Sequence, residues 1–218
     1  SFDWVDSNQH YTEALTYTQA IISNSGYTLI PRYDYLFRET TKQQQYLETL
    51  FGAEASTSPT RDAIHLLANT FLAQGNVNVT GGGFGWFRPT DELYKKYVVG
   101  DFRRDHNLTG NLNTTTNFEM IEGVKYFVPR TLPNTNTGFY SIGKYRTIDP
   151  AAKVLPNWAS TINLPILRLA DVMLLHAEAQ YFTGNEPGAR TTLSNLRQRA
   201  VATGSSLATL NNAYRKAD

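Results

Sequence analysis

The sequence predicts a mainly α-helical fold with tetratricopeptide-like helical repeats, irregular loops and a small β-hairpin. Three observations support this. An apolar helical hairpin lies near the C-terminus, several amphipathic segments follow helix-capping residues, and stretches rich in Asn, Thr and Gly separate them. Such alternation is typical of helices that pack together and carry long loops between them.

The clearest element is a helical hairpin within residues 163–203. Leu167–Phe182 is apolar at most positions, so we expect this helix to be buried between other elements. Gly184 is suited to a left-handed cap, and Asn185 to the start of a second helix. That second helix places small and apolar residues on one face: Ala189, Leu193, Leu196 and Ala200. The spacing fits a tetratricopeptide unit and a generic helical hairpin equally well.

The other elements follow from caps and periodicity. A short strand is expected at Thr49–Ala55 and a β-hairpin within Phe118–Pro129, with its turn at Glu122 and Gly123. Further helices are expected at residues 7–25, from Ser58 and Pro59 to Gly75, from Thr90 to Gly100, and after Ser206.

Composition excludes several classes of function. The 20 basic and 19 acidic residues give a net charge of +1, which argues against a nucleic-acid-binding surface. The chain has no cysteine, so disulfides, thiolate metal sites and cysteine nucleophiles are excluded. Its four histidines are scattered, and the glycine run at residues 81–85 matches no nucleotide-binding motif. We therefore predict no catalytic residue, no metal site and no cofactor.

Two groups of charged residues have structural interpretations. Asp101 and Asp105 flank Arg103 and Arg104, which predicts ion pairs after a helix rather than a pair of glycosidase carboxylates.

The second group lies in the apolar helix. Arg168, Asp171 and Glu178 need partners if they are buried, and we expect polar bonds between helices there. His176 is expected to be a satisfied core or interhelix residue.

Four stretches of sequence resemble the SusD/RagB family of surface nutrient-binding lipoproteins of Bacteroidota. The stretches are residues 13–37 (EALTYTQAIISNSGYTLIPRYDYLF), residues 89–104 (PTDELYKKYVVGDFRR), the short GKY at 143–145, and LPILRLADVMLLHAEA at 164–179 followed by LSNLRQRA at 193–200. The last pair is similar to the family's most specific signature. The resemblance spans nearly the whole chain, so we interpret residues 1–218 as one SusD/RagB-like region. Residues 7–25 would be a helix of a repeat unit and residues 76–162 a loop-rich insertion.

The resemblance implies a non-catalytic protein that captures a glycan or oligosaccharide and delivers it to a SusC-like TonB-dependent transporter. It also implies an outer-membrane, cell-surface location through a lipid anchor that this chain lacks. Family members are usually about twice this length, so we expect a fragment without the N-terminal part and the C-terminal tail. Three alternatives remain open beside this function: a RagB-like receptor for peptides, a helical-repeat scaffold that binds a protein partner, and a hydrolase, which release of product from a glycan would reveal.

The best candidate for a ligand site is the loop at residues 76–88. Aromatic rings can stack on the C–H face of a sugar, while amides and a guanidinium can bond its hydroxyl groups. Trp86 and Phe87 could instead hold the loop onto the domain. The candidate residues are Phe84, Trp86 and Phe87 for stacking and Asn76, Asn78 and Arg88 for hydrogen bonding.

Overall fold

The computed structural model describes residues 7–55, 86–109, 118–121, 124–127, 141–145 and 162–217. Helices make up most of these residues, and the described strands form three two-stranded antiparallel sheets. The prediction of a mainly α fold is therefore confirmed. The helix expected after Ser58 lies outside the described residues. None of the helices in the described part is long and apolar enough to cross a membrane.

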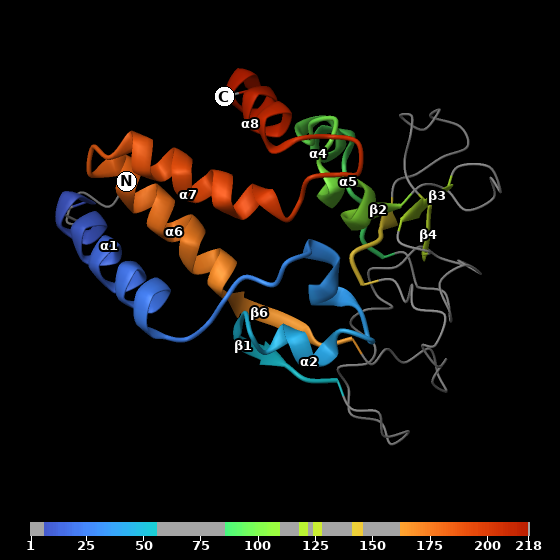
Figure 1. Ribbon diagram of the computed structural model, residues 1–218, viewed down its shortest axis with the longest axis horizontal. Helices are drawn as coiled ribbons and strands as arrows, with labels where there is room; N and C mark the ends of the chain where they lie inside the picture. Colours follow the sequence, from blue (N-terminus) through green and yellow to red (C-terminus); the bar gives the residue numbers. More distant parts are fainter. Residues whose placement is uncertain are drawn as a thin grey trace.

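Three long helices form a layer at one end of the molecule. α6 (Leu169–Phe182) lies between α1 (Ser7–Asn24) and α7 (Glu186–Gln198), as Figure 1 shows. α8 (Leu207–Ala217) follows and packs on α7. Ala177 of α6 and Ala189 of α7 are both buried, so small side chains lie where the two helices approach each other.

The junction between α6 and α7 agrees with the predicted caps. Gly184 has a φ of 86°, the left-handed conformation that glycine adopts readily. The side chain of Asn185 accepts a hydrogen bond from the backbone N–H of Gly188 at 3.0 Å, which caps α7.

α6 differs from the prediction in two ways. It begins at Leu169, because Leu167 and Arg168 belong to strand β6 (Leu164–Arg168). It is also not buried on most sides, since Leu174 is 49% exposed and Leu175 is 53% exposed. In the described part of the chain α6 has two helical neighbours, α1 and α7, and these cover only part of its circumference.

β6 pairs with β1 (Thr49–Ala53), which confirms the strand expected in this region. The register runs from Thr49 opposite Arg168 to Ala53 opposite Leu164, with irregularities on either side of Phe51. Two short helices precede β1: the 3₁₀ helix η1 (Tyr33–Phe37) and α2 (Lys42–Gln45). Neither was expected from the sequence, because elements of four or five residues carry too little periodicity to recognise.

The middle of the chain forms short elements beside this framework. α4 (Asp91–Lys96) is followed by α5 (Phe102–Asn107), and β2 (Leu108–Thr109) pairs with β5 (Ser141–Ile142). The predicted β-hairpin is confirmed as β3 (Phe118–Ile121) paired with β4 (Val124–Phe127).

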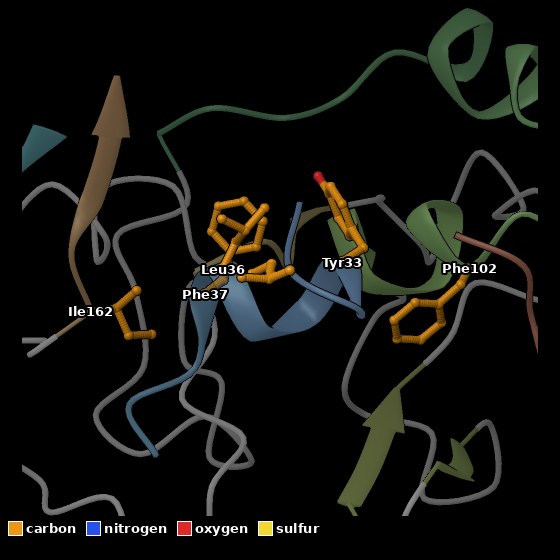
Figure 2. Close-up of a cluster of buried hydrophobic side chains, with 6 residues drawn as sticks. Tyr33, Leu36, Phe37, Phe102 and Ile162 are labelled. Carbon is orange, nitrogen blue, oxygen red and sulfur yellow. The ribbon is translucent and has the colours of Figure 1, made fainter. Parts of the chain in front are cut away.

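One hydrophobic cluster joins three distant parts of the sequence. Figure 2 shows side chains from η1 meeting Phe102 of α5 and Ile162, which precedes β6. Leu36 and Phe37 at the centre are fully buried. The buried members are Ile30, Tyr33, Leu36, Phe37, Phe102 and Ile162.

A buried ion pair links the segments just before β1 and η1 to the end of α7. The Glu48 side chain is fully buried, and both of its carboxylate oxygens accept hydrogen bonds from the guanidinium of Arg199. One of these oxygens also accepts from the backbone N–H of Ile30 at 3.1 Å. Arg199 is the second arginine of the LSNLRQRA stretch, so this part of the family signature has a structural role.

The structure contradicts one prediction for the polar residues in and just before α6 and confirms another. Arg168 bonds Asp171, three residues along the chain, with Nη2 to Oδ1 at 2.8 Å, and Glu178 is exposed. The expected bonds between helices are therefore wrong for these three residues, because the pair closes locally at the start of α6. The expectation for His176 is confirmed, since its Nδ1 lies 2.9 Å from Thr18 Oγ1 on α1.

Candidate functional site

The described end of the candidate loop is exposed. Trp86 is 72% exposed, Phe87 is 52% exposed, and Arg88 is exposed beside them. More than half of the surface of each of these two residues is thus open to solvent, as a stacking platform requires. The other three candidate residues, Asn76, Asn78 and Phe84, lie outside the described residues.

α4 fixes the end of this segment. Pro89 keeps the residue before it out of the helical conformation, so Arg88 enters the helix from an extended chain. Thr90 then caps α4, because its hydroxyl oxygen accepts a hydrogen bond from the backbone N–H of Leu93 at 3.3 Å. Asp91 and Glu92 lie in the first turn, where their negative charge interacts favourably with the helix dipole.

A chain of hydrogen bonds connects α4 to the core. The amide nitrogen of Asn107 donates to the hydroxyl of Tyr97 at 3.1 Å, and the amide oxygen accepts from the hydroxyl of Tyr33 at 3.0 Å. Burial raises the pKa of Tyr33 to about 12, so this hydroxyl stays protonated and donates. Tyr97 and Asn107 were not predicted to have this role, because their partners are distant in the sequence.

The acidic and basic residues around α5 form the predicted ion pairs. Asp101 caps α5, and its fully buried carboxylate accepts from the guanidinium of Arg103, with Nη2 to Oδ2 at 2.6 Å. Asp105 pairs with Arg104 at 2.8 Å. Each carboxylate is occupied by its arginine, which is the arrangement of a structural cluster.

α8 is attached to this cluster. The hydroxyl of Tyr214 donates to Asp101 Oδ2. Burial and the hydrogen bond to Asp101 together raise the pKa of Tyr214 to about 12. Burial alone would lower the pKa of Arg103, but the hydrogen bond and charge of Asp101 raise it above its ordinary value. α5 and α8 are therefore held together by charge-assisted bonds.

The chemistry available at the exposed segment is recognition by contact. Two aromatic rings and one guanidinium can stack on and hydrogen-bond a ligand. Within the residues that the structure describes, no group of three or more His, Asp or Glu side chains could hold a metal ion.

A concave surface lies between α7 and α8, apart from the exposed segment at 86–88. This groove has a volume of about 580 Å³ and is lined by polar and charged residues. Its cationic side chains are Arg190, Arg197 and Arg215.

Comparisons with known proteins give a family match for part of the chain and a shared fold for most of it. Residues 125–217 match the SusD family. Among solved structures, NanU from B. fragilis is 21% identical with a TM-score of 0.60, and the alignment covers 97% of this chain and 41% of that protein. Surface glycan-binding protein A from Bacteroides thetaiotaomicron, solved in complex with laminarihexaose, is 21% identical with a TM-score of 0.57, covering 91% of this chain and 44% of that protein.

A third structure extends this agreement. A SusD superfamily protein from Bacteroides fragilis NCTC 9343 has a TM-score of 0.64 at 14% identity, covering 96% of this chain and 42% of that protein. No curated protein sequence matches the chain. The chain spans less than half of the length of these three solved structures. The family match over residues 125–217 and the shared fold confirm the resemblance seen in the motifs.

Proposed function

We propose that this chain binds a glycan or oligosaccharide without catalysing its cleavage. The observation that carries the proposal is the exposure of Trp86 and Phe87 on a SusD fold, beside the guanidinium of Arg88. Exposed aromatic rings cost solvation free energy unless a ligand covers them, and the C–H face of a sugar ring is a suitable cover. Surface glycan-binding protein A, which shares the fold, was solved with the glucan oligosaccharide laminarihexaose.

In this proposal the scaffold and the site have separate tasks. α6 and α7 form the packed layer, and the bonds of Tyr97 and Asn107 keep the segment before α4 in place. A rigid support reduces the conformational entropy lost on binding, which favours affinity. Asn76, Asn78 and Phe84 would complete the site, with the amides bonding hydroxyl groups and the third ring extending the stacking surface.

The proposal includes the cellular setting that the family suggests. The complete protein would lie at the outer membrane, exposed on the cell surface through a lipid anchor. It would pass its ligand to a SusC-like TonB-dependent transporter. Co-purification of the complete protein with the transporter encoded beside it would test this step, and its failure would leave glycan binding itself untouched.

Titration calorimetry of the 218-residue chain against a panel of polysaccharides and a peptide mixture tests the ligand class. The Trp86→Ala variant should lose about thirtyfold in affinity for any glycan that binds, because a central tryptophan commonly contributes 2 kcal/mol or more. Tyr17→Ala is the matched control, since Tyr17 is an aromatic residue on α1 that is 69% exposed. Binding of peptides alone would refute the glycan proposal and favour a RagB-like receptor.

The groove between α7 and α8 favours a second candidate, a scaffold that binds a protein partner. Its three arginines would suit an acidic segment of that partner. If Arg215→Ala abolishes capture of a partner while Trp86→Ala changes no glycan affinity, the scaffold function replaces the first proposal.

A further inference from the structure

The groove between α7 and α8 has the size of a binding site for a small ligand. Its volume of about 580 Å³ lies within the usual range of such sites, about 300–1,000 Å³. One wall is α7 between Glu186 and Arg197, and the other is formed by Asn211 and Arg215 of α8. None of the lining residues belongs to the segment at 86–88, so the groove is a separate place on the molecule.

The lining carries more positive than negative charge. Its charged side chains are Glu186, Arg190, Arg197 and Arg215, which gives a net charge of +2, three positive charges against one negative. Glu186 pairs with Arg190 at 2.6 Å, but both side chains are about half exposed, and such pairs contribute little stability. A guanidinium binds a carboxylate through paired N–H donors, so the groove suits an anionic ligand that carries carboxylates.

A ligand reaches these side chains from solvent. The side chain of Arg190 is 48% exposed, and Arg215 is exposed on the opposite wall. Two neutral polar residues of the lining, Thr191 and Asn195, are exposed as well. The groove therefore presents charged and neutral hydrogen-bonding groups on accessible side chains.

Arg197 is held in position between the two helices. Its Nη1 donates to Asn211 Oδ1 at 3.3 Å, and Asn211 Nδ2 in turn donates to Ser194 Oγ at 2.8 Å. The guanidinium carbon of Arg197 lies 4.7 Å from the centre of the Tyr214 ring, within range of a cation–π attraction. These contacts restrict the side chain, so less conformational entropy is lost when an anion binds beside it.

The rest of the lining favours a sugar over a peptide. An amphipathic helix binds through an apolar stripe, but among the lining residues only Pro187 and Leu193 are apolar. An extended peptide adds to the edge of a sheet, and both walls of this groove are helical. Sugar hydroxyls both donate and accept, which suits the amide of Asn195. They also suit the hydroxyl of Thr191, which donates to the backbone carbonyl of Pro187 and accepts from a ligand.

We propose that this groove binds an acidic oligosaccharide, one that carries carboxylate groups on its rings. The carboxylates pair with Arg190, Arg197 and Arg215, and ring hydroxyls bond Asn195 and Thr191. The inference rests on the proposed function for the class of ligand, a glycan, and adds the charge of that glycan and a second place of binding. An acidic segment of a protein would bring the same charge, and the experiment separates the two.

Titration calorimetry of the 218-residue chain against matched probes tests the proposal. The probes are tetragalacturonate, its methyl ester, in which every carboxylate is neutralised, and tetraglutamate with blocked ends as the acidic peptide. Tetragalacturonate should bind most tightly, and its methyl ester at least about tenfold more weakly, because the attraction to the arginines is lost. The affinity for tetragalacturonate should also fall between about 0.05 and 0.5 M salt, since salt screens exposed charges.

Arg215→Gln identifies the groove as the place of binding. Because Arg215 is exposed, the substitution should leave the thermal midpoint nearly unchanged. It should weaken tetragalacturonate binding about tenfold, the loss expected for a hydrogen bond to a charged group. Asn195→Ala keeps the charge and should weaken binding about threefold, the loss expected for a neutral hydrogen bond. The matched control is Lys96→Gln, which removes an exposed positive charge outside the groove and should leave the affinity unchanged.

Three results would overturn the proposal. Tetragalacturonate does not bind, tetraglutamate binds as tightly or more tightly, or Lys96→Gln weakens binding of the acidic sugar as much as Arg215→Gln does. The second result would favour the protein scaffold.

This inference and the proposed site at 86–88 fail separately. If tetragalacturonate does not bind while neutral glycans bind in a manner that depends on Trp86, only the groove proposal fails. If tetragalacturonate binding depends on Arg215 while Trp86→Ala changes no glycan affinity, only the site at 86–88 fails.

Discussion

Replacing Arg199 by methionine should destabilise the protein strongly. Both carboxylate oxygens of Glu48 accept from Arg199, and Glu48 is fully buried. After the substitution the carboxylate keeps one hydrogen bond, from the backbone N–H of Ile30. An uncompensated buried charge of this kind costs about 3–5 kcal/mol. Domains have about 5–15 kcal/mol of stability in total, so the variant would lose a large share of it.

A double-mutant cycle tests the reasoning. Glu48→Gln removes the buried charge and keeps an acceptor for the backbone N–H of Ile30. The double variant, Glu48→Gln with Arg199→Met, should therefore lose at least about 1 kcal/mol less free energy of unfolding than the two single variants lose together. Urea denaturation followed by circular dichroism gives the free energies of unfolding. Arg190→Met is the matched control on the same helix, since Arg190 pairs with Glu186 and both side chains are about half exposed.

The control should change stability by no more than about 0.5 kcal/mol, because exposed ion pairs contribute little. The reasoning is refuted if Arg199→Met costs less than about 1 kcal/mol. It is equally refuted if the two single effects add to within about 0.5 kcal/mol, since independent sites behave in that way.

Three further predictions concern pH and backbone conformation. Burial is the larger cause and the charge of Arg168 the smaller one of a lowered pKa at Lys144, from 10.5 to about 8. Below pH 8 the folded protein holds a buried, charged lysine, which lowers the free energy of unfolding. That free energy should rise as the pH increases from 8 to 10.5, because the folded protein then releases a proton that the unfolded chain still holds. Lys144→Met should therefore raise the free energy of unfolding at pH 7 by about 1–2 kcal/mol. This figure already subtracts the attraction between the ammonium group and the ring of Phe37, which the substitution removes. In urea titrations the gain should disappear near pH 10.5. Tyr214→Phe should lower the free energy of unfolding by about 1–2 kcal/mol at pH 7. Because the pKa of Tyr214 is raised to about 12, the contribution of its hydroxyl to stability is complete below pH 10 and is lost as the pH rises through about 12. The stabilities of the variant and the unsubstituted protein should therefore converge in alkaline denaturation. Gly184→Ala should lower stability by about 1 kcal/mol because alanine disfavours the φ of 86° at this position. A steric clash does not contribute, since a Cβ there meets no atom within 4 Å. Gly184→Asn should lower the thermal midpoint less than Gly184→Ala, because asparagine adopts this conformation more readily.

Much of the local structure was predictable from short stretches of sequence. The caps at Asn185 and Thr90 and the turn at Gly184 depend on neighbouring residues only, and the structure confirms each of them. The β-hairpin of β3 and β4 was equally predictable, because its turn residues and β-prone flanks are adjacent in the chain.

The candidate site was predictable only in part. Aromatic residues in a glycine-rich stretch indicated Trp86 and Phe87, but their exposure depends on how α4 sits on the rest of the protein. The bonds that hold α4 join Tyr97, Asn107 and Tyr33, which are distant in sequence and carry no motif that pairs them. The role of Asn76, Asn78 and Phe84 stays a prediction.

The sequence by itself indicated the family resemblance, the helical character and the caps, because these follow from residue types at fixed short spacings. The tertiary structure decided which charges pair and which side chains are buried. Arg168 was expected to reach another helix, yet it bonds Asp171 at the start of its own helix. Glu48 and Arg199 meet across the fold. These outcomes depend on distances between segments far apart in the chain, and burial sets their energies once the segments have packed.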